Sequence, residues 1–133
     1  MSGYVLDTSA VLALRGDEAG ADRVEQLLRG AGAGRASVQV SFMTRMEMLY
    51  RITADEGAAA AEDAVRLLDA AGVKWLGCEA EILAQAAAIK SRGGLSVADA
   101  WIAATALIHD AVLVHKDPEF AAVTEVQQER LKP

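Results

Sequence analysis

Four acidic side chains in this sequence have the residue type and placement of a metal site. Asp7, Glu47, Asp99 and Asp117 come from four separate segments of the chain. Carboxylates that gather at one place repel each other, and this costs stability unless a cation neutralises them. Carboxylate oxygens at an open site are hard ligands that suit Mg²⁺ or Mn²⁺. If the four acids meet, the chemistry they favour is divalent-metal chemistry.

Taken one at a time, two of these acids have ordinary structural interpretations. Glu47 stands four residues before Arg51 in a helical pattern, a spacing typical of a surface ion pair. Asp99 follows Ser96 by three residues, as in a helix-capping motif, and lies in a first turn where the helix dipole favours an anion. Neither residue indicates a site by itself, so the hypothesis depends on where the chain places all four.

The elements that must position the acids alternate along the sequence. Nearly all-apolar strands that alternate with helices predict a parallel sheet covered on both faces, an α/β fold. The expected strands cover residues 4–6, 36–41, 73–76, 111–114 and, weakly, 123–126. The expected helices cover 8–14, 17–28, 42–53, 58–71, 79–91 and much of 95–110, with a short helical piece in 115–120.

Strand ends explain how distant acids would converge. Asp7 directly follows the first expected strand, and Asp117 comes just after the fourth. In a parallel sheet the carboxyl ends of the strands share one edge, where binding sites form. A helix cap remains an alternative for Asp7, and an Asp-Pro turn with Pro118 remains one for Asp117.

Helical spacing also predicts which side chains face the core. The inward set comprises Val65, Leu67, Leu68 and Ala71 in one helix and Ile82, Leu83, Ala86 and Ala87 in another. Cys78, the only cysteine, excludes an intramolecular disulfide and is expected to be a small buried hydrophobe. His109 ends the apolar helix, where a cation suits the dipole, and His115 is expected at the surface or at the rim of the site.

Chain length and composition limit the classes of protein to which this sequence can belong. At 133 residues, with 53% hydrophobic and 24% charged residues, the chain is expected to form one globular domain over residues 1–133. The short apolar run at the start is interrupted by Asp7 and resembles no signal peptide, and no segment is long enough for a membrane span. These features favour a cytoplasmic protein.

Four segments together carry a resemblance to a known family. YVLDTSAVLAL, SFMTRMEMLYR, LSVADAWIAATAL and VLVHKDPEF, in this order from Asp7 to Phe120, resemble the PIN-domain family and most of all the VapC-type toxins of bacterial toxin–antitoxin pairs. The segment around Asp99 is the most specific. The resemblance implies a three-layer α/β/α sandwich with a mainly parallel central sheet and a Mg²⁺- or Mn²⁺-dependent endoribonuclease activity.

The resemblance also implies roles for individual residues. Asp7, Glu47, Asp99 and Asp117 would form the catalytic and metal-binding set. Among the hydroxyl side chains, Thr8 or Ser9 and Ser96 or Thr105 would orient these ligands. The match is looser at Asp117, because HKDPE replaces the usual threonine or serine before the last aspartate, and Glu119 could share or take its role.

The formal net charge of -6 opposes the binding of a nucleic-acid substrate. Two bound divalent ions would leave about -2, a modest repulsion at physiological ionic strength. Single basic residues could guide RNA locally, although each is also well explained as solvated surface charge. They are Arg15, Arg45, Arg51, Lys90, Arg92 and Lys116.

Two other protein classes and one non-enzymatic function are alternatives for this sequence. A haloacid-dehalogenase-like phosphatase would need a second acid where Ser9 stands, and a response-regulator receiver would need an acidic pair after the first strand. The non-enzymatic alternative is a catalytically inactive PIN-like module that binds RNA or protein. The family resemblance implies an RNA substrate, a cognate antitoxin protein as partner, and a homodimer or a toxin–antitoxin hetero-oligomer.

Overall fold

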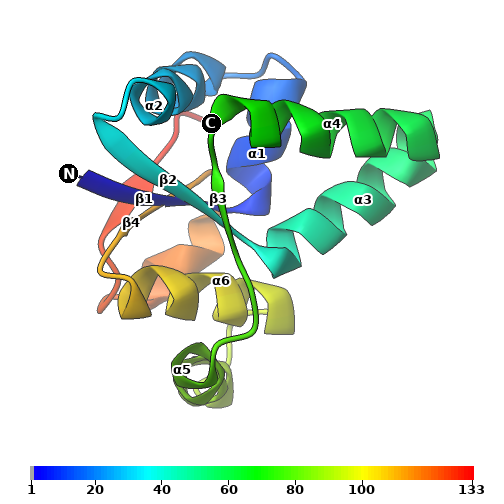
Figure 1. Cartoon of the computed structure of the whole chain (residues 1–133). Helices are drawn as coiled ribbons and strands as arrows, with labels where there is room; N and C mark the ends of the chain where they lie inside the picture. Colours follow the sequence, from blue (N-terminus) through cyan, green and yellow to red (C-terminus); the bar gives the residue numbers. More distant parts are fainter. Residues whose placement is uncertain (1) are drawn as a thin grey trace.

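A parallel sheet forms the middle of the molecule (Figure 1). The computed structural model describes residues 2–133. The sheet has five strands in the order β3-β2-β1-β4-β5, and every neighbouring pair is parallel. β1 is therefore central, as expected for its apolar run of residues 4–6. The strands are β1 (Ser2–Leu6), β2 (Ala36–Ser41), β3 (Lys74–Leu76), β4 (Val112–His115) and β5 (Gln128–Arg130).

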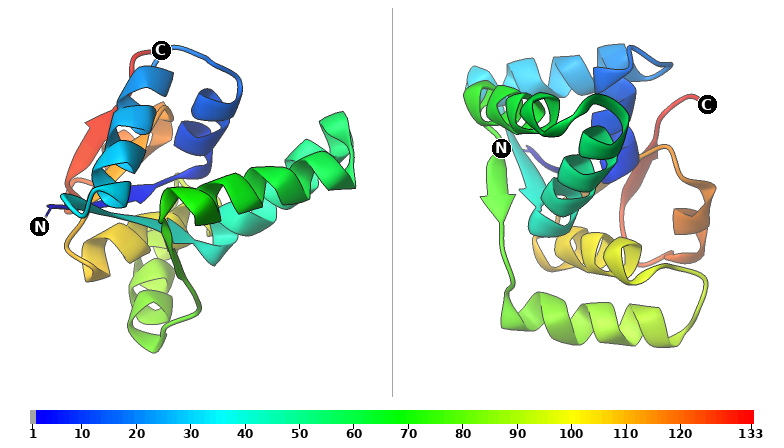
Figure 2. Two further views of the ribbon diagram at one scale, coloured as in Figure 1. Left: turned by 45° about the horizontal axis from the view of Figure 1, so that its top comes forward. Right: turned by 90° about the vertical axis from the view of Figure 1, so that its right-hand side faces the viewer.

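Helices cover both faces of the sheet (Figures 1 and 2). Val5 and Leu113 point to the face covered by α5 and α6, whereas Leu6 and Val114 point to the face covered by α1, α2 and the α3–α4 pair. This arrangement confirms the predicted three-layer α/β/α sandwich. The helices are α1 (Thr8–Arg15), α2 (Ala21–Gly32), α3 (Phe42–Glu56), α4 (Ala58–Ala71), α5 (Ala80–Ser91), α6 (Val97–Ile108) and the short 3₁₀ helix η1 (Pro118–Ala122).

Helix α6 is the most enclosed helix of the sandwich. Every residue from Ala100 to Ala106 is buried between the sheet and α5. Small alanine side chains allow this close approach, and a helix that is apolar all round is stable only when it is packed on several sides. Ser96 caps its first turn by accepting a hydrogen bond from the Asp99 amide at 3.1 Å. The cap fixes the place at which Asp99 leaves the core.

The helix predicted over residues 17–28 begins and ends later than expected. Asp17 and Gly20 have positive φ angles of 51° and 95°, so the chain turns before α2 starts at Ala21. The helix then continues through Gly30 to Gly32, because neither glycine adopts the left-handed conformation that would end it. The helix predicted to end near Thr53 likewise continues to Glu56, where Gly57 stops it.

The last strand was predicted in the wrong place. Residues 123–126 form no strand; β5 is Gln128–Arg130, which pairs with β4. Val123 and Val126 are apolar because both are buried in the core beside α5 and α6, rather than because they belong to the sheet. The apolar pattern of this segment thus reflects burial without strand pairing.

Three side chains expected in the core lie at the surface, and so does the cysteine. Leu67 is 66% exposed and Leu83 is 56% exposed, while Ala87 is also exposed. Cys78, predicted to be buried, is exposed in the loop after β3. Each helix buries a narrower stripe than the sequence predicted. Within residues 2–133, no helix is both long and apolar enough to cross a membrane.

The turn before α2 offers a stability test. A methyl group added at Gly20 would lie 2.9 Å from the Cβ of Leu131, whereas one at Gly72, which also has a left-handed conformation, would meet no atom within 4 Å. Gly72→Ala should lower the free energy of unfolding by about 1–2 kcal/mol from backbone strain. Gly20→Ala should cost about 1–3 kcal/mol more, because it adds a clash. Equal losses in urea denaturation would contradict this account of the turn.

Candidate active site

Asp7 is a buried carboxylate at the end of the central strand. It directly follows β1, caps α1 by accepting a hydrogen bond from the Ala10 amide at 2.9 Å, and is only 2% exposed. Its own amide donates to the Val114 carbonyl at 3.1 Å, which ties the end of β1 to β4. The cap and the candidate ligand are therefore the same residue.

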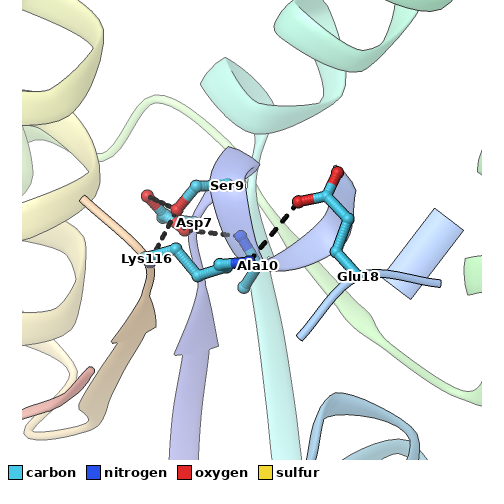
Figure 3. Close-up of polar contacts among 5 residues, drawn as sticks. All are labelled: Asp7, Ser9, Ala10, Glu18 and Lys116. Carbon is cyan, nitrogen blue, oxygen red and sulfur yellow. Dashed lines mark hydrogen bonds and ion pairs between the residues drawn. The ribbon is translucent and has the colours of Figure 1, made fainter. Parts of the chain in front are cut away.

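Ser9 joins Asp7 to the segment that follows β4 (Figure 3). Its hydroxyl lies 2.7 and 2.9 Å from the two carboxylate oxygens of Asp7, to which it donates. The same oxygen accepts a hydrogen bond from the Lys116 amide at 2.8 Å. The Lys116 ammonium points away toward Glu18, 3.4 Å from its carboxylate. Ser9 thereby fixes the spacing between Asp7 and the chain that leads to Asp117.

Glu47 is held by a hydroxyl of α1 rather than by an arginine. The Thr8 hydroxyl donates to the Glu47 carboxylate at 2.6 Å and also lies 3.3 Å from the Thr44 hydroxyl. Within residues 2–133, no ion pair joins Glu47 to Arg51, which was the structural alternative for this acid. Glu47 is half-buried and turned toward α1.

Three further acids form a compact group beside this pair. Asp99, Asp117 and Glu119 each offer a carboxylate oxygen, and these oxygens lie within 4.8 Å of one another. Asp117 also caps η1 by accepting a hydrogen bond from the Glu119 amide at 2.9 Å, so its role in the turn is real as well. Glu119, which the sequence offered as a helper or substitute for Asp117, stands beside it.

Electrostatic coupling connects the acids to one another. Burial raises the pKa of Asp7 to about 7, against hydrogen bonds from Ser9 and Ala10, and the negative charges of Asp99 and Asp117 raise it further. Partial burial raises the pKa of Asp99 to about 6, with added repulsion from Asp117, Glu47 and Glu119. All four predicted acids, with Glu119, therefore share one local field.

The two hydroxyls predicted near Asp99 differ in position. The exposed Ser96 caps α6 and accepts the Asp99 amide, so it positions the backbone of that acid. Thr105 is fully buried, and its hydroxyl donates to the Trp101 carbonyl at 2.8 Å, one turn back in the same helix. Within residues 2–133, Thr105 makes no hydrogen bond to the acids, and its single donor is used inside the helix.

His115 was expected at the surface or the rim and is instead 1% exposed. Its Nδ1 accepts a hydrogen bond from the Asp117 amide at 3.1 Å, and its Nε2 lies 2.9 Å from Oε1 of Gln128. Burial lowers the pKa of His115, which favours the neutral ring. No local signal identified Gln128, because its contact depends on β5 pairing with β4. His109 ends α6 as expected and contacts Glu79 at 2.9 Å.

The donor set fits a hard divalent cation. The ion pairs of residues 2–133 bring no lysine or arginine to Asp7, Glu47, Asp99 or Asp117. Among residues 2–133, the donors that contact the carboxylates of Asp7, Glu47 and Asp117 are neutral hydroxyls and backbone amides. The pKa values of Asp7 and Asp99 are accordingly raised. Carboxylate oxygens with uncompensated charge suit Mg²⁺ or Mn²⁺.

Together, the fold and the site define an α/β/α protein with an acidic site at the carboxyl edge of a parallel sheet. The model of the PIN domain family matches residues 4–126, and the chain belongs to that family. A search of curated protein sequences finds no match.

Solved structures show the same fold and confirm the resemblance to VapC-type toxins. VapBC-1 of nontypeable Haemophilus influenzae is 26% identical, with a TM-score of 0.75, over 96% of this chain and 97% of that one. VapBC2 of Rickettsia felis, bound to a fragment of its promoter DNA, is 15% identical, with a TM-score of 0.78, over 98% and 99%. VapC20 of Mycobacterium tuberculosis, a sarcin-ricin loop cleaving toxin, is 19% identical, with a TM-score of 0.69, over 93% and 98%.

The raised pKa of Asp7 predicts how stability depends on pH without metal. The folded protein binds this proton more tightly than the unfolded chain, so its contribution is complete at low pH and is lost as pH rises toward about 7. At about pH 8, Asp7→Asn should raise the unfolding free energy of the metal-free protein by roughly 1–4 kcal/mol. The gain should largely disappear near pH 4.

Asp22→Asn, at an exposed acid in the first turn of α2, is the control and should show no such pH-dependent gain. Denaturant unfolding with chelator present measures all three proteins. A loss of stability in Asp7→Asn at high pH would show that the buried charge is compensated in some other way.

Proposed function

We propose that this chain is a Mg²⁺- or Mn²⁺-dependent endoribonuclease, built as one nuclease domain over residues 1–133, and the toxin of a type II toxin–antitoxin pair. The observation that carries the proposal is the group of acids at the sheet edge, for which the ion pairs among residues 2–133 provide no basic side chain. Membership in the PIN domain family and the likeness to the VapBC structures support the same class.

Asp7, Asp99 and Asp117 would hold the metal, together with Glu119, whose oxygen lies in the same group as those of Asp99 and Asp117. Glu47 would bind metal directly or orient the attacking water. When bound, a divalent ion supplies the positive charge that activates a water and stabilises the attacked phosphate. Such a site needs little from the protein beyond placement of the ligands.

The hydroxyl side chains of α1 would provide that placement. Ser9 keeps both oxygens of Asp7 in one orientation, and Thr8 keeps the Glu47 carboxylate turned toward the site. Both donors are neutral, so they orient the acids without competing with a cation for their charge. Ser96 would act on the third acid through the helix cap.

Cleavage of RNA by the purified protein tests the enzyme proposal. Wild type should cleave a fluorogenic RNA panel in Mg²⁺ or Mn²⁺ and lose activity with chelator. Asp7→Asn and Asp99→Asn should each lower the rate by more than about 100-fold, since loss of groups that merely support metal ligands already costs 10- to 100-fold. Asp22→Asn should cleave like wild type.

Circular dichroism of each variant shows that its fold is intact. Absence of metal-dependent cleavage by wild type across the panel would favour the alternative, an inactive module that binds RNA or protein. Activity retained in a folded Asp99→Asn protein would remove the acidic group from the mechanism.

A cognate antitoxin is the proposed partner. Solved structures similar to this chain are toxin–antitoxin complexes, among them the VapBC structures of Rickettsia felis and Haemophilus influenzae. The partner would cover apolar surface and block the acidic edge in the cytoplasm, where RNA is accessible. A homodimer or a toxin–antitoxin hetero-oligomer is part of the same proposal.

Expression in bacteria without the antitoxin tests the biological role. Induced wild type should arrest growth, and Asp99→Asn at equal protein level should not, because arrest requires cleavage. Sequencing of RNA 5′ ends after induction would identify the target. Harmless expression of a protein that cleaves RNA when purified would contradict the toxin role and leave the nuclease proposal intact.

A further inference from the structure

The segment that carries Asp117 and Glu119 leaves β4 at the surface and returns to the core at Phe120. Asp117 is half-buried, Glu119 is exposed and Phe120 is fully buried. Flexible acids would offer a cation poorly ordered ligands. The side chains that fix this segment therefore bear on the geometry of the site.

The hydrogen bonds of His115 determine which ring nitrogen carries the proton. The Asp117 amide donates to Nδ1 at 3.1 Å, so Nδ1 must be the unprotonated nitrogen. A neutral ring then carries its proton on Nε2 and donates it to Oε1 of Gln128 at 2.9 Å. This assignment leaves both ring nitrogens paired.

The same network fixes the amide of Gln128. With Oε1 turned toward the imidazole, its Nε2 donates to the carbonyls of Phe120 at 2.8 Å and Val123 at 2.9 Å. The opposite orientation would place two donors against each other at the ring and an oxygen against two carbonyls. One histidine and one glutamine thus hold the segment at three backbone atoms: the Asp117 amide and two carbonyls.

Packing strengthens the contact between β4 and η1. The His115 ring lies against the buried Phe120 ring, with centroids 4.9 Å apart at a tilt of 56°. Gln128 belongs to β5. The next residue of that strand, Glu129, pairs with Val114 of β4 in the sheet. Asp117 and Glu119 are therefore fastened to two strands of the sheet, and their position does not depend on the turn alone.

We propose that His115 and Gln128 are positioning residues for the metal site, a clamp that keeps Asp117 and Glu119 within reach of Asp99. This inference rests on the proposed function. It assigns a role to the buried His115 and to Gln128, which lies in β5, nine residues beyond Glu119 and outside the segments that contain the acids. The imidazole acts through the Asp117 amide and touches neither substrate nor ion.

Mn²⁺ binding by the full chain, measured by electron paramagnetic resonance of the free ion, provides a readout independent of cleavage. Gln128→Met keeps the shape of a linear side chain and removes all three hydrogen bonds of the amide. It should weaken Mn²⁺ affinity by about 10-fold or more, as loss of supporting groups does at metal sites. Gln39→Met is the matched control, since Gln39 lies in β2 and its side chain hydrogen-bonds only the Ser37 hydroxyl among the described residues.

Two substitutions at His115 separate positioning from general destabilisation. His115→Ala and His115→Asn both remove the buried ring, so they lose the same packing against Phe120. The asparagine oxygen can still accept the amide of the second residue onward, as in an Asx turn, and alanine cannot. We expect Mn²⁺ affinity to fall in the order wild type, His115→Asn, His115→Ala. In ¹⁵N–¹H spectra of metal-free wild type, the His115 proton should reside on Nε2.

The results of these measurements can overturn the clamp, the nuclease proposal or both. Folded Gln128→Met with wild-type Mn²⁺ affinity, equal affinities in the two His115 variants, or a proton on Nδ1 would overturn the clamp. If Gln128→Met fails to fold, the His115 pair still decides. Wild type that binds Mn²⁺ tightly but cleaves no RNA would refute the nuclease and spare the clamp, whereas wild type that binds no Mn²⁺ would refute both.

Discussion

The constraint on which this structure depends is the burial of the Asp7 carboxylate, which forms no ion pair with a basic side chain of residues 2–133. Two donors, the Ser9 hydroxyl and the Ala10 amide, hold it at the end of β1. They do not offset the loss of hydration, because the pKa of Asp7 rises to about 7. A group this unfavourable persists only where the surroundings leave it no alternative position. The central strand, apolar on both faces and paired on both edges, provides such surroundings.

The parallel sheet brings further acids to the buried Asp7 carboxylate and so forms a site. β1 and β4 are neighbours, so the residues that follow them meet at one edge. The Asp7 amide donates to the Val114 carbonyl of β4, and Ser9, which donates to the Asp7 carboxylate, accepts the Lys116 amide just after β4. Helix α6 brings Asp99 to the same edge from the other layer, because its buried alanines allow it to pack tightly on the sheet. Elements distant in sequence therefore add their charges in one place, at a cost in stability that a divalent cation would reverse.

The sequence predicted well the features that neighbouring residues decide, and poorly those that depend on contacts between distant segments. The strand over residues 36–41 and the helix over 58–71 match the structure at both ends, because caps and glycines beside them decide their bounds. Residues 123–126 were wrongly predicted as a strand, since burial and sheet pairing leave the same apolar pattern. Leu67 was wrongly placed in the core because periodicity cannot tell how wide the buried stripe is. The contact of His115 with Gln128 could not be predicted, because only the pairing of β4 with β5 creates it.

At this edge of the sheet, neutral donors orient the acids, and the uncompensated negative charge of the acids would attract a cation. Thr8 orients Glu47, Ser9 orients Asp7, and the Glu119 amide orients Asp117, yet none of these donors carries a charge. Had arginines held the acids instead, the geometry would be equally fixed, but the field that attracts a cation would be cancelled. If, as proposed, this chain of net charge -6 acts on RNA, that field would gather the cations that make the approach of phosphate favourable. Neutral hydroxyl and amide donors therefore fix the positions of the acids and leave their negative charge available to a cation.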